Sequence, residues 1–268
     1  MNAQQRPTPL ALVTGASSGI GYQYARLLAE KGYDLLLVSN EELRIAEVAR
    51  ELRRQFGVRA DGLCRDLSLA DAADSLFEYT RQQGFEVEVL VNNAGVFFFD
   101  DLTETDSRRI ERMIGLHVQT VTMLCRYFGA AMKRRRAGYI LNMSSLSAWT
   151  PAPGISVYAA SKSYIRKFSQ MLRYELHQYG VGVTTVCPGA IATGLYNLSD
   201  YYQRLALRLG VMMKPERLAR KGLRAMFARR DYILPGAVNR FFVLALYLLP
   251  VQLIYYIKEH TKLYRYGR

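Results

Sequence analysis

The sequence is poor in cysteine and histidine, with three of each among its 268 residues. The cysteines are Cys64, Cys125 and Cys187, which form neither an even set nor a metal-ligand spacing. We therefore predict three reduced thiols, each buried as a small apolar side chain. His177 and His260 have no partners at ligand spacing, so no metal site is predicted.

A basic leader followed by an apolar segment is also missing, because residues Met1 to Pro9 are polar. This absence predicts a cytoplasmic, reducing compartment. An apolar fraction of 50% with 22% charged residues excludes a disordered chain, and the length excludes a small disulfide scaffold. There are no repeats of solenoid length and no low-complexity linker. We expect one domain over residues 1–268.

Acidic residues are scarce near the C-terminus. The formal net charge is +13, and residues from Tyr201 to Arg268 hold 14 Lys/Arg against 3 Asp/Glu. The first 200 residues are nearly neutral by comparison. A basic, aromatic-rich tail on a neutral body predicts that the tail alone meets an anionic surface or ligand. Since no recognition helix or aromatic RNA motif is visible, nucleic acid is not a predicted partner.

Apolar runs alternate with amphipathic stretches along the first 190 residues. The predicted strands are Leu10 to Thr14, Asp34 to Ser39, Arg59 to Cys64, Glu88 to Asn92, Tyr139 to Ser144 and Gly182 to Cys187. The predicted helices are Ile20 to Lys31, Glu41 to Phe56, Ala70 to Gln83, Asp106 to Arg136 and Ser156 to Tyr179. Consecutive βα units of this regularity indicate an α/β fold, a Rossmann-type doubly wound parallel sheet with helices on both faces.

A glycine-rich loop follows the first strand and opens the first helix, the context in which such a loop cradles a pyrophosphate. It reads Thr14-Gly15-Ala16-Ser17-Ser18-Gly19-Ile20-Gly21. Three further motifs stand in register with it: Asn92-Asn93-Ala94-Gly95, Tyr158-x-x-x-Lys162 and Cys187-Pro188-Gly189. Together they resemble the classical short-chain dehydrogenase/reductase family over roughly Thr8 to Leu195. The resemblance implies a nicotinamide-dependent oxidoreductase.

Tyr158 and Lys162 are four residues apart in a predicted helix, so both side chains lie on one face. An ammonium group near a tyrosine stabilises its phenolate. The resemblance implies that Tyr158 is the general acid of reduction, with Lys162 lowering its pKa and holding the nicotinamide ribose. It also implies that Ser145, thirteen residues earlier, hydrogen-bonds the substrate carbonyl. Ser144 is the alternative, although we expect it still to belong to the strand.

His117 stands where many relatives have an asparagine that bends the long helix and holds a water beside the lysine. A histidine there can hold a water or carry a proton, which would keep the relay in altered form. A structural role inside the helix is the other interpretation. Both stay open at the sequence level.

In dinucleotide-binding folds, residues at the end of the second strand contact the adenosine ribose. An acidic residue there binds the 2′-hydroxyl of NAD, whereas a nearby arginine accommodates the 2′-phosphate of NADP. This chain has Ser39 and Asn40 at those positions, and both can donate hydrogen bonds to a phosphate. Glu41 argues for NAD, but we predict NADP. The resemblance further implies cofactor contacts from a set of backbone and side-chain groups along the sheet edge: Thr14, Gly15, Ser17, Ser18, Gly19, Ile20, Gly21, Asp66, Leu67, Asn92, Ala94, Gly95, Pro188, Gly189, Ile191 and Thr193.

The C-terminal third divides into two predicted parts. Residues 194–230 are expected to hold substrate-lid helices, whose apolar residues favour a hydrophobic substrate. Residues 231–268 form an apolar, basic tail in which Phe241 to Ile257 carry no charge. Since Pro250 interrupts this stretch, we expect a helix-Pro-helix hairpin rather than a spanning helix. It would lie on the sheet, in a dimer interface or on the inner face of an anionic membrane.

The leading functional hypothesis is an oxidoreductase that interconverts a ketone and a secondary alcohol on an apolar, lipid-like substrate. Ketones of 3-ketoacyl, ketosphinganine and steroid type all fit it. The family resemblance also implies a homo-oligomer, a dimer or a tetramer. The alternatives are a non-catalytic cofactor sensor and a membrane-attached binding protein on the same fold. Retention of Ser145, Tyr158 and Lys162 together favours catalysis.

Overall fold

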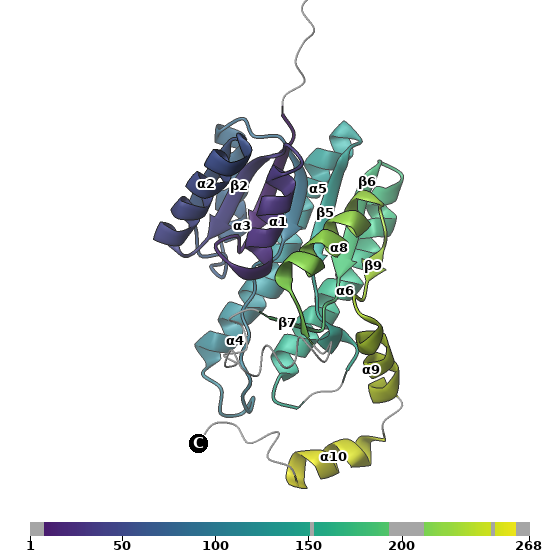
Figure 1. The fold of residues 1–268 in the computed structure, drawn as a ribbon. Coiled ribbons are helices and arrows are strands. Elements are labelled where there is room, and N and C mark those ends of the chain that lie inside the picture. The colour runs from purple at the N-terminus through teal and green to yellow at the C-terminus, as the bar shows by residue number, and fades with distance from the viewer. Residues whose placement is uncertain (1–7, 151–152, 193–211, 248–249, 261–268) are drawn as a thin grey trace, which may run out of the picture.

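The computed structural model describes residues 8–150, 153–192, 212–247 and 250–260. Within them, seven parallel strands form one sheet in the order β3-β2-β1-β4-β5-β6-β9 (Figure 1). Its strands are β1 (Leu10–Thr14), β2 (Asp34–Ser39), β3 (Ala60–Cys64), β4 (Val87–Asn92), β5 (Gly138–Met143), β6 (Val181–Val186) and β9 (Tyr232–Ile233). The predicted α/β, doubly wound fold is confirmed.

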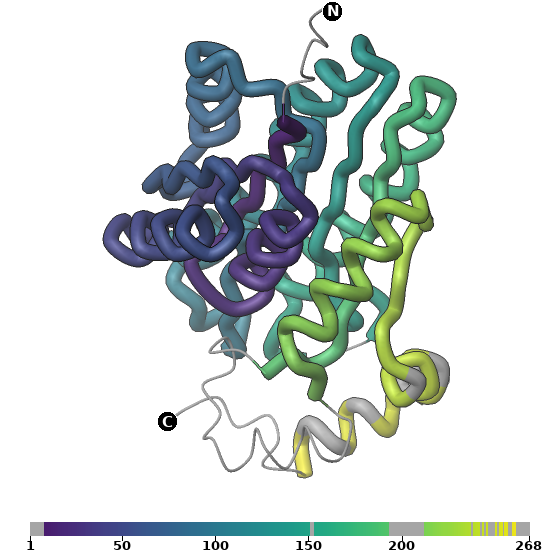
Figure 2. The backbone as a smooth tube through the Cα atoms, turned by 45° about the horizontal axis from the view of Figure 1, so that its top comes forward, coloured from purple at the N-terminus to yellow at the C-terminus, as the bar shows by residue number. Residues whose placement is uncertain are grey.

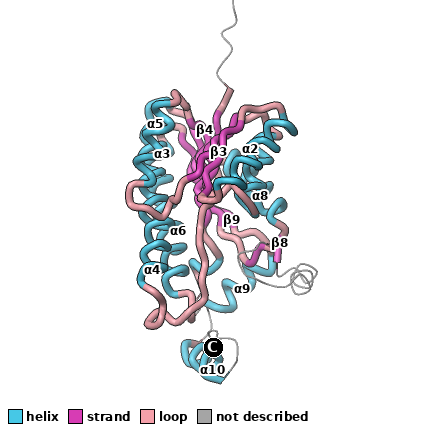
Figure 3. The backbone as a smooth tube through the Cα atoms, turned by 90° about the vertical axis from the view of Figure 1, so that its left-hand side faces the viewer, coloured by secondary structure: helices cyan, strands magenta, loops and turns pink. Residues whose placement is uncertain are grey.

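Helices cover both faces of this sheet (Figure 3). They are α1 (Gly19–Ala29), α2 (Glu42–Phe56), α3 (Ala72–Gln82), α4 (Ser107–Ile114), η1 (Gly115–Thr120), α5 (Val121–Arg135), η2 (Leu146–Ala148), α6 (Ser156–His177), α8 (Pro215–Phe227), α9 (Ala237–Tyr247) and α10 (Val251–His260). One core packs α1, α2 and α8 on the sheet, and the other packs α3, α5 and α6. Because both faces are covered, the central strands are buried along their whole length, which explains their unbroken apolar runs.

The strand order places the binding crevice. β1 lies between β2 and β4, so the chain builds the sheet outward in one direction to β3 and then returns to continue from β4 in the other. The loops after β1 and β4 therefore diverge at the carboxyl end of the sheet. In open α/β sheets, ligands bind at this point of reversal.

Cys64 corrects one prediction, since it is exposed whereas Cys125 and Cys187 are buried. The reason is its position in β3, the edge strand, whose residues alternate between covered and open environments. An apolar neighbourhood in the sequence does not distinguish an edge strand from a central one.

The predicted helix from Asp106 to Arg136 comprises α4, η1 and α5 in direct succession. Its middle, η1, is a π-helix that contains His117. A π-helical turn widens a helix locally and is frequent at functional sites. The sequence predicts a bend here only through the family resemblance. β9 and a short pair, β7 (Ala190–Ile191) with β8 (Met212–Met213), were not predicted.

The C-terminal third differs in part from the predicted lid and tail. α8 lies in the predicted lid range, yet it packs beside α1 as a layer helix, where a side chain at Gly222 would meet the Tyr24 hydroxyl at 2.3 Å. Residues 194–211 of the predicted lid lie outside the described residues. Two helices, α9 and α10, flank Pro250 as expected, and Figure 2 shows them leaving the body after β9. In the described part of the chain, no helix has the length and apolarity to cross a bilayer.

Candidate active site

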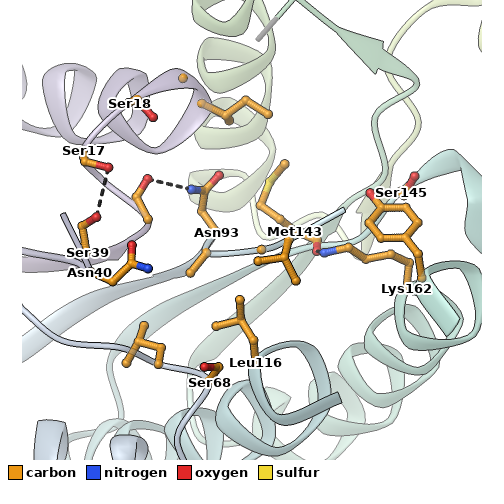
Figure 4. A pocket seen from close by; sticks show the side chains of 18 of the residues that line it. Ser17, Ser18, Ser39, Asn40, Ser68, Asn93, Leu116, Met143, Ser145 and Lys162 are labelled. Carbon is orange, nitrogen blue, oxygen red and sulfur yellow. Dashed lines mark hydrogen bonds between the residues drawn. The ribbon is translucent and has the colours of Figure 1, made fainter. Parts of the chain in front are cut away.

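A pocket of about 600 Å³ lies at the carboxyl ends of the central strands (Figure 4). Its size is typical of small-molecule and cofactor sites. The pocket joins the glycine loop to the start of α6, and its lining comprises Gly15, Ser17, Ser18, Gly19, Ile20, Ser39, Asn40, Glu41, Arg65, Asp66, Leu67, Ser68, Asn93, Ala94, Gly95, Val96, Arg112, Leu116, Met143, Ser144, Ser145, Tyr158, Lys162, Pro188, Gly189 and Ile191. Most of the predicted site residues are thus brought together.

The glycine loop is shaped by close backbone contacts. Gly15 has φ +64°, and a Cβ there would lie 2.8 Å from Ala94 Cα. A Cβ at Gly21 would lie 2.0 Å from the Gly15 carbonyl oxygen. Larger residues would therefore displace the loop, because neither position has room for a side chain. The loop leads into the N-terminus of α1, where free N–H groups and the helix dipole favour an anion.

Thr14 holds this loop to the end of β4. Its hydroxyl accepts hydrogen bonds from the backbone N–H groups of Asn93 and Ala94, both at 3.0 Å. The Asn93 side chain in turn donates to the carbonyl oxygens of Thr14 and Gly15. Thr14 and Gly21 thus shape the pocket without lining it.

Asn92 occupies a different place from the one predicted. Its amide donates to Asn142 Oδ1 at 2.8 Å inside the core, and the pocket is lined instead by Asn93. Successive residues at a strand end face opposite sides, so only one of two adjacent asparagines can face the ligand. The Asn92-Asn93 pair in the sequence indicates that an asparagine lines the pocket. Which of the two faces the pocket depends on the direction in which each side chain leaves the strand end.

A hydroxyl and carboxylate cluster closes the pocket at the end of β2. Ser39 Oγ donates to Ser17 Oγ at 3.0 Å (Figure 4). Ser17 Oγ donates to the carboxylate of Glu41. The Glu41 backbone N–H donates to Ser39 Oγ at 3.2 Å. Ser39 stands where an acidic residue is expected in NAD-binding relatives, but the carboxylate of Glu41, two residues later, lines the pocket instead.

Asp66 follows β3 and is held in a tight turn. It accepts hydrogen bonds from the backbone and hydroxyl of Ser68 at 2.9 and 2.7 Å, and pairs with Arg112 at 3.0 Å. Burial opposes ionisation, but these partners outweigh it and lower the pKa of Asp66. Arg65 and Arg112 also line the pocket, and neither was predicted as a pocket residue. The position of Arg65 beside Asp66 is the signal that could have indicated it.

Tyr158 and Lys162 lie on one face of α6, with exposed fractions of 8% and 5%. The Lys162 ammonium is 5.6 Å from the centre of the Tyr158 ring and donates to the Met143 carbonyl oxygen at 3.1 Å. Burial lowers the pKa of Lys162 to about 8, because a charged group is poorly solvated there. An ammonium so placed gains by facing a negative charge, which is what a tyrosine phenolate would supply.

Two serines follow β5, and their bonds distinguish them. Ser144 Oγ donates to the backbone carbonyl of Lys162 at 2.7 Å and is 3% exposed. Ser145 Oγ accepts from the Ser147 N–H at 3.2 Å, which leaves its own hydroxyl proton to donate. Figure 4 shows Ser145 and Lys162 together at one end of the pocket, with Ser17 and Ser39 at the other. This arrangement favours Ser145 as the donor to a carbonyl oxygen.

His117 is fully buried and lies behind the pocket lining. Nε2 accepts from the Val96 N–H at 3.1 Å, and Nδ1 lies 2.9 Å from Ser161 Oγ. Burial, and then the charge of Lys162, lower the pKa of His117 well below its usual range.

Of the predicted nicotinamide contacts, Pro188, Gly189 and Ile191 line the pocket, and Thr193 lies outside the described residues.

The family profile of short chain dehydrogenases matches residues 9–200. The chain belongs to the short-chain dehydrogenase family. It is 34% identical over 190 residues to the very-long-chain 3-oxoacyl-CoA reductase of Rattus norvegicus, covering 69% of this chain and 60% of that protein. It is 37% identical over 188 residues to the oxidoreductase YmfI of Bacillus subtilis, covering 70% and 76%.

Solved structures of family members agree in fold. A short-chain dehydrogenase from Sphingobium yanoikuyae in complex with NADPH superposes with a TM-score of 0.78, at 26% identity, covering 97% of this chain and 98% of that one. A metagenomic short-chain oxidoreductase in complex with NADP gives 0.71 at 27% identity, covering 84% and 96%. The chain spans about three fifths of the rat relative and one third of EphD from Mycobacterium tuberculosis, to which it is 32% identical over 194 residues, 72% of this chain.

Proposed function

We propose that this protein is a nicotinamide-dependent oxidoreductase that interconverts a ketone and a secondary alcohol. The observation that carries the proposal is that Ser145, Tyr158 and Lys162 share one pocket with the glycine loop. A general acid, its activating cation and a hydroxyl donor are the groups that carbonyl reduction requires of a protein.

The pocket suits a dinucleotide. Gly15 and Gly21 let the loop pack against the end of β4 where a side chain would not fit, and the loop leads into the N-terminus of α1, which favours an anion. Ser17, Ser18 and Gly19 would hold the pyrophosphate there, while Asp66 and Leu67 would contact adenine. When bound, the cofactor would supply the hydride.

The chain's own residues supply the proton and the orientation. Tyr158 would donate its phenolic proton to the carbonyl oxygen in reduction and accept one in oxidation. Lys162 would stabilise the phenolate of Tyr158, since its ammonium lies 5.6 Å from the centre of that ring. Ser145 would donate to the same oxygen and so stabilise the negative charge that develops on it.

NADP is the cofactor that we propose, in preference to NAD. Arg65 and Arg112 line the pocket, and Arg65 Nε is buried with no hydrogen-bond partner among the described residues. Asn40 adds an amide donor. The Glu41 carboxylate, which Ser17 holds in the pocket, opposes a 2′-phosphate. Family members of similar fold have been solved with NADPH and NADP.

We propose an apolar substrate of lipid type. Leu116, Met143 and Ile191 line the pocket, and the Phe97 ring stands perpendicular to that of Tyr158 at a centroid distance of 5.0 Å. The rat relative is named for a very-long-chain 3-oxoacyl-CoA substrate.

We also propose that the protein forms a homo-oligomer. Exposed Tyr164 and Met171 on α6 offer apolar contact area for it, and light scattering measures the mass.

The deciding experiment measures loss of NADPH and NADH absorbance with ketones of graded chain length. We expect turnover with NADPH that improves with chain length and disappears in Tyr158→Phe. Cofactor binding without turnover of any ketone would favour a non-catalytic cofactor sensor instead.

A further inference from the structure

Exposed apolar side chains gather on the two C-terminal helices. Phe241 on α9 is 71% exposed, and Tyr255 and Tyr256 on α10 are 60% and 58% exposed. Val238 on α9 and Leu253 on α10 are also exposed. We call these five residues the aromatic tail face. Large apolar groups left in water in such number mark an interaction surface.

Among the described residues, the aromatic tail face is left exposed. Every side chain of α10 that the structure describes is exposed, namely those of Gln252, Leu253, Tyr255, Tyr256, Glu259 and His260. Figures 1 and 3 show α10 standing away from the sheet and its helical layers.

This face lies at the end of the molecule where the pocket is found. α9 follows β9 at the carboxyl end of the sheet, and α9 touches the pocket wall, since a Cβ at Gly189 would meet Asn239 Oδ1 at 2.5 Å. The loop after β4 adds exposed Val96, Phe99 and Leu102 at the same end. Segments far apart in the sequence thus place apolar groups around one end of the protein.

Most of the charged residues that flank the apolar stretch in the sequence are basic. No charged residue occurs from Phe241 to Ile257, and this stretch is preceded by Arg240 and followed by Lys258, Lys262, Arg265 and Arg268 against Glu259 alone. Apolar and aromatic side chains bordered by cations are the pattern of helices that lie in a bilayer interface. The same charge works against a second copy of this basic chain as the occupant.

We propose that the aromatic tail face binds the surface of a bilayer that contains anionic lipid. Tyr255, Tyr256 and Phe241 enter the headgroup layer, and the flanking cations meet the lipid phosphates. The tail therefore attaches the protein to the membrane with its pocket end facing the lipid. This inference goes beyond the proposed function, because membrane attachment does not require turnover.

The test is co-sedimentation of the full chain with vesicles of phosphatidylcholine alone or mixed with phosphatidylglycerol, at low and high salt. We expect binding to the mixed vesicles that weakens as salt rises, because salt screens the electrostatic part. The affinity of the variant Phe241→Ser/Tyr255→Ser/Tyr256→Ser for the mixed vesicles should fall by at least about tenfold, because it buries less apolar area. Its melting temperature should not change, since the three side chains are exposed.

Tyr174→Ser is the matched control. Tyr174 is 62% exposed, near the end of α6 that leads to the amino end of β6, so its loss should leave vesicle binding unchanged. Wild-type protein that ignores anionic vesicles at low salt, or a triple variant that binds like the wild type, overturns the inference. A mass that halves in the triple variant without vesicle binding also overturns it, in favour of a second copy. Reduction of a water-soluble ketone without vesicles tests the proposed function separately.

Discussion

Nε2 of His117 accepts a hydrogen bond of 3.1 Å from the backbone N–H of Val96. The donor is a peptide group, so Nε2 carries no proton and Nδ1 carries the proton of the neutral ring. Nδ1 then donates to Ser161 Oγ, and Ser161 donates to the backbone carbonyl of Tyr158 at 2.8 Å. His117 thereby links the loop after β4 to the turn of α6 that carries Tyr158. The geometry favours positioning over proton relay.

We expect His117→Phe to lower stability by about 1–3 kcal/mol for each buried polar group left without a partner. The kcat should fall as Tyr158 loses its support, and His117→Gln should restore part of both. The inflections of kcat against pH should stay at the same pH in all three proteins, because a neutral positioning ring does not titrate in this range. Loss of an inflection in His117→Phe would instead identify a proton relay.

The second prediction concerns Tyr158→Phe, which removes only the phenolic oxygen. We expect turnover of the best ketone to fall by about 10² or more, the usual contribution of a positioned proton donor. Binding of NADPH, measured by fluorescence titration, should be nearly unchanged. Lys162→Ala should weaken both, and wild-type turnover in Tyr158→Phe would remove the tyrosine from the mechanism.

The third prediction uses the buried ammonium of Lys162, whose pKa burial lowers to about 8 from an ordinary 10.5. Between these values the unfolded chain holds a proton that the folded chain has released, so stability rises with pH by about 1.4 kcal/mol per unit. Below pH 8 both states are charged and this dependence vanishes. The cofactor-free protein should therefore gain stability between pH 8 and 10 relative to Lys162→Met.

Urea unfolding of both proteins at several pH values measures this difference. Lys162→Met should be the more stable of the two at pH 7. The substitution removes the buried charge, and the methionine side chain is nearly as long as that of lysine. A pH-independent difference between the two proteins would mean that the ammonium is better solvated than its burial indicates.

The sequence predicts the sheet well because the central strands are continuous apolar runs bounded by turns, as in Leu10–Thr14. It fails where neighbours in space decide. Nothing local separates exposed Cys64 on the edge strand β3 from buried Cys187, which follows β6. β9 has only two residues, too few to show a periodicity. In the site, motifs identified Tyr158 and Lys162. Arg112 could not be found, because helix packing brings it to the pocket.

The fourth prediction concerns the carboxylate at the adenosine end. Glu41 is held by Ser17 where a 2′-phosphate would approach, so Glu41→Gln should raise the preference for NADPH by removing its repulsion. Ser39→Asp should act in the opposite direction, since a carboxylate accepts from the 2′-hydroxyl of NAD. The ratio of kcat/KM for the two cofactors measures both. A wild-type preference for NADH of about tenfold or more, with no response to Glu41→Gln, would reject the NADP assignment.

The last prediction concerns the aromatic wall beside the reacting group. Phe97 stands edge-on to Tyr158, whereas the next residue, Phe98, lies under the guanidinium of Arg109 at 4.7 Å. Phe97→Ala removes apolar surface beside Tyr158. We expect the chain of a bound ketone to pass this ring, so KM for a long-chain ketone should rise about tenfold. KM for a small ketone should change little, because it does not reach the ring. Phe98→Ala is the matched control, and we expect it to leave both values near those of the wild type. Equal effects of Phe97→Ala on short and long ketones would show that the ring supports Tyr158 rather than the substrate.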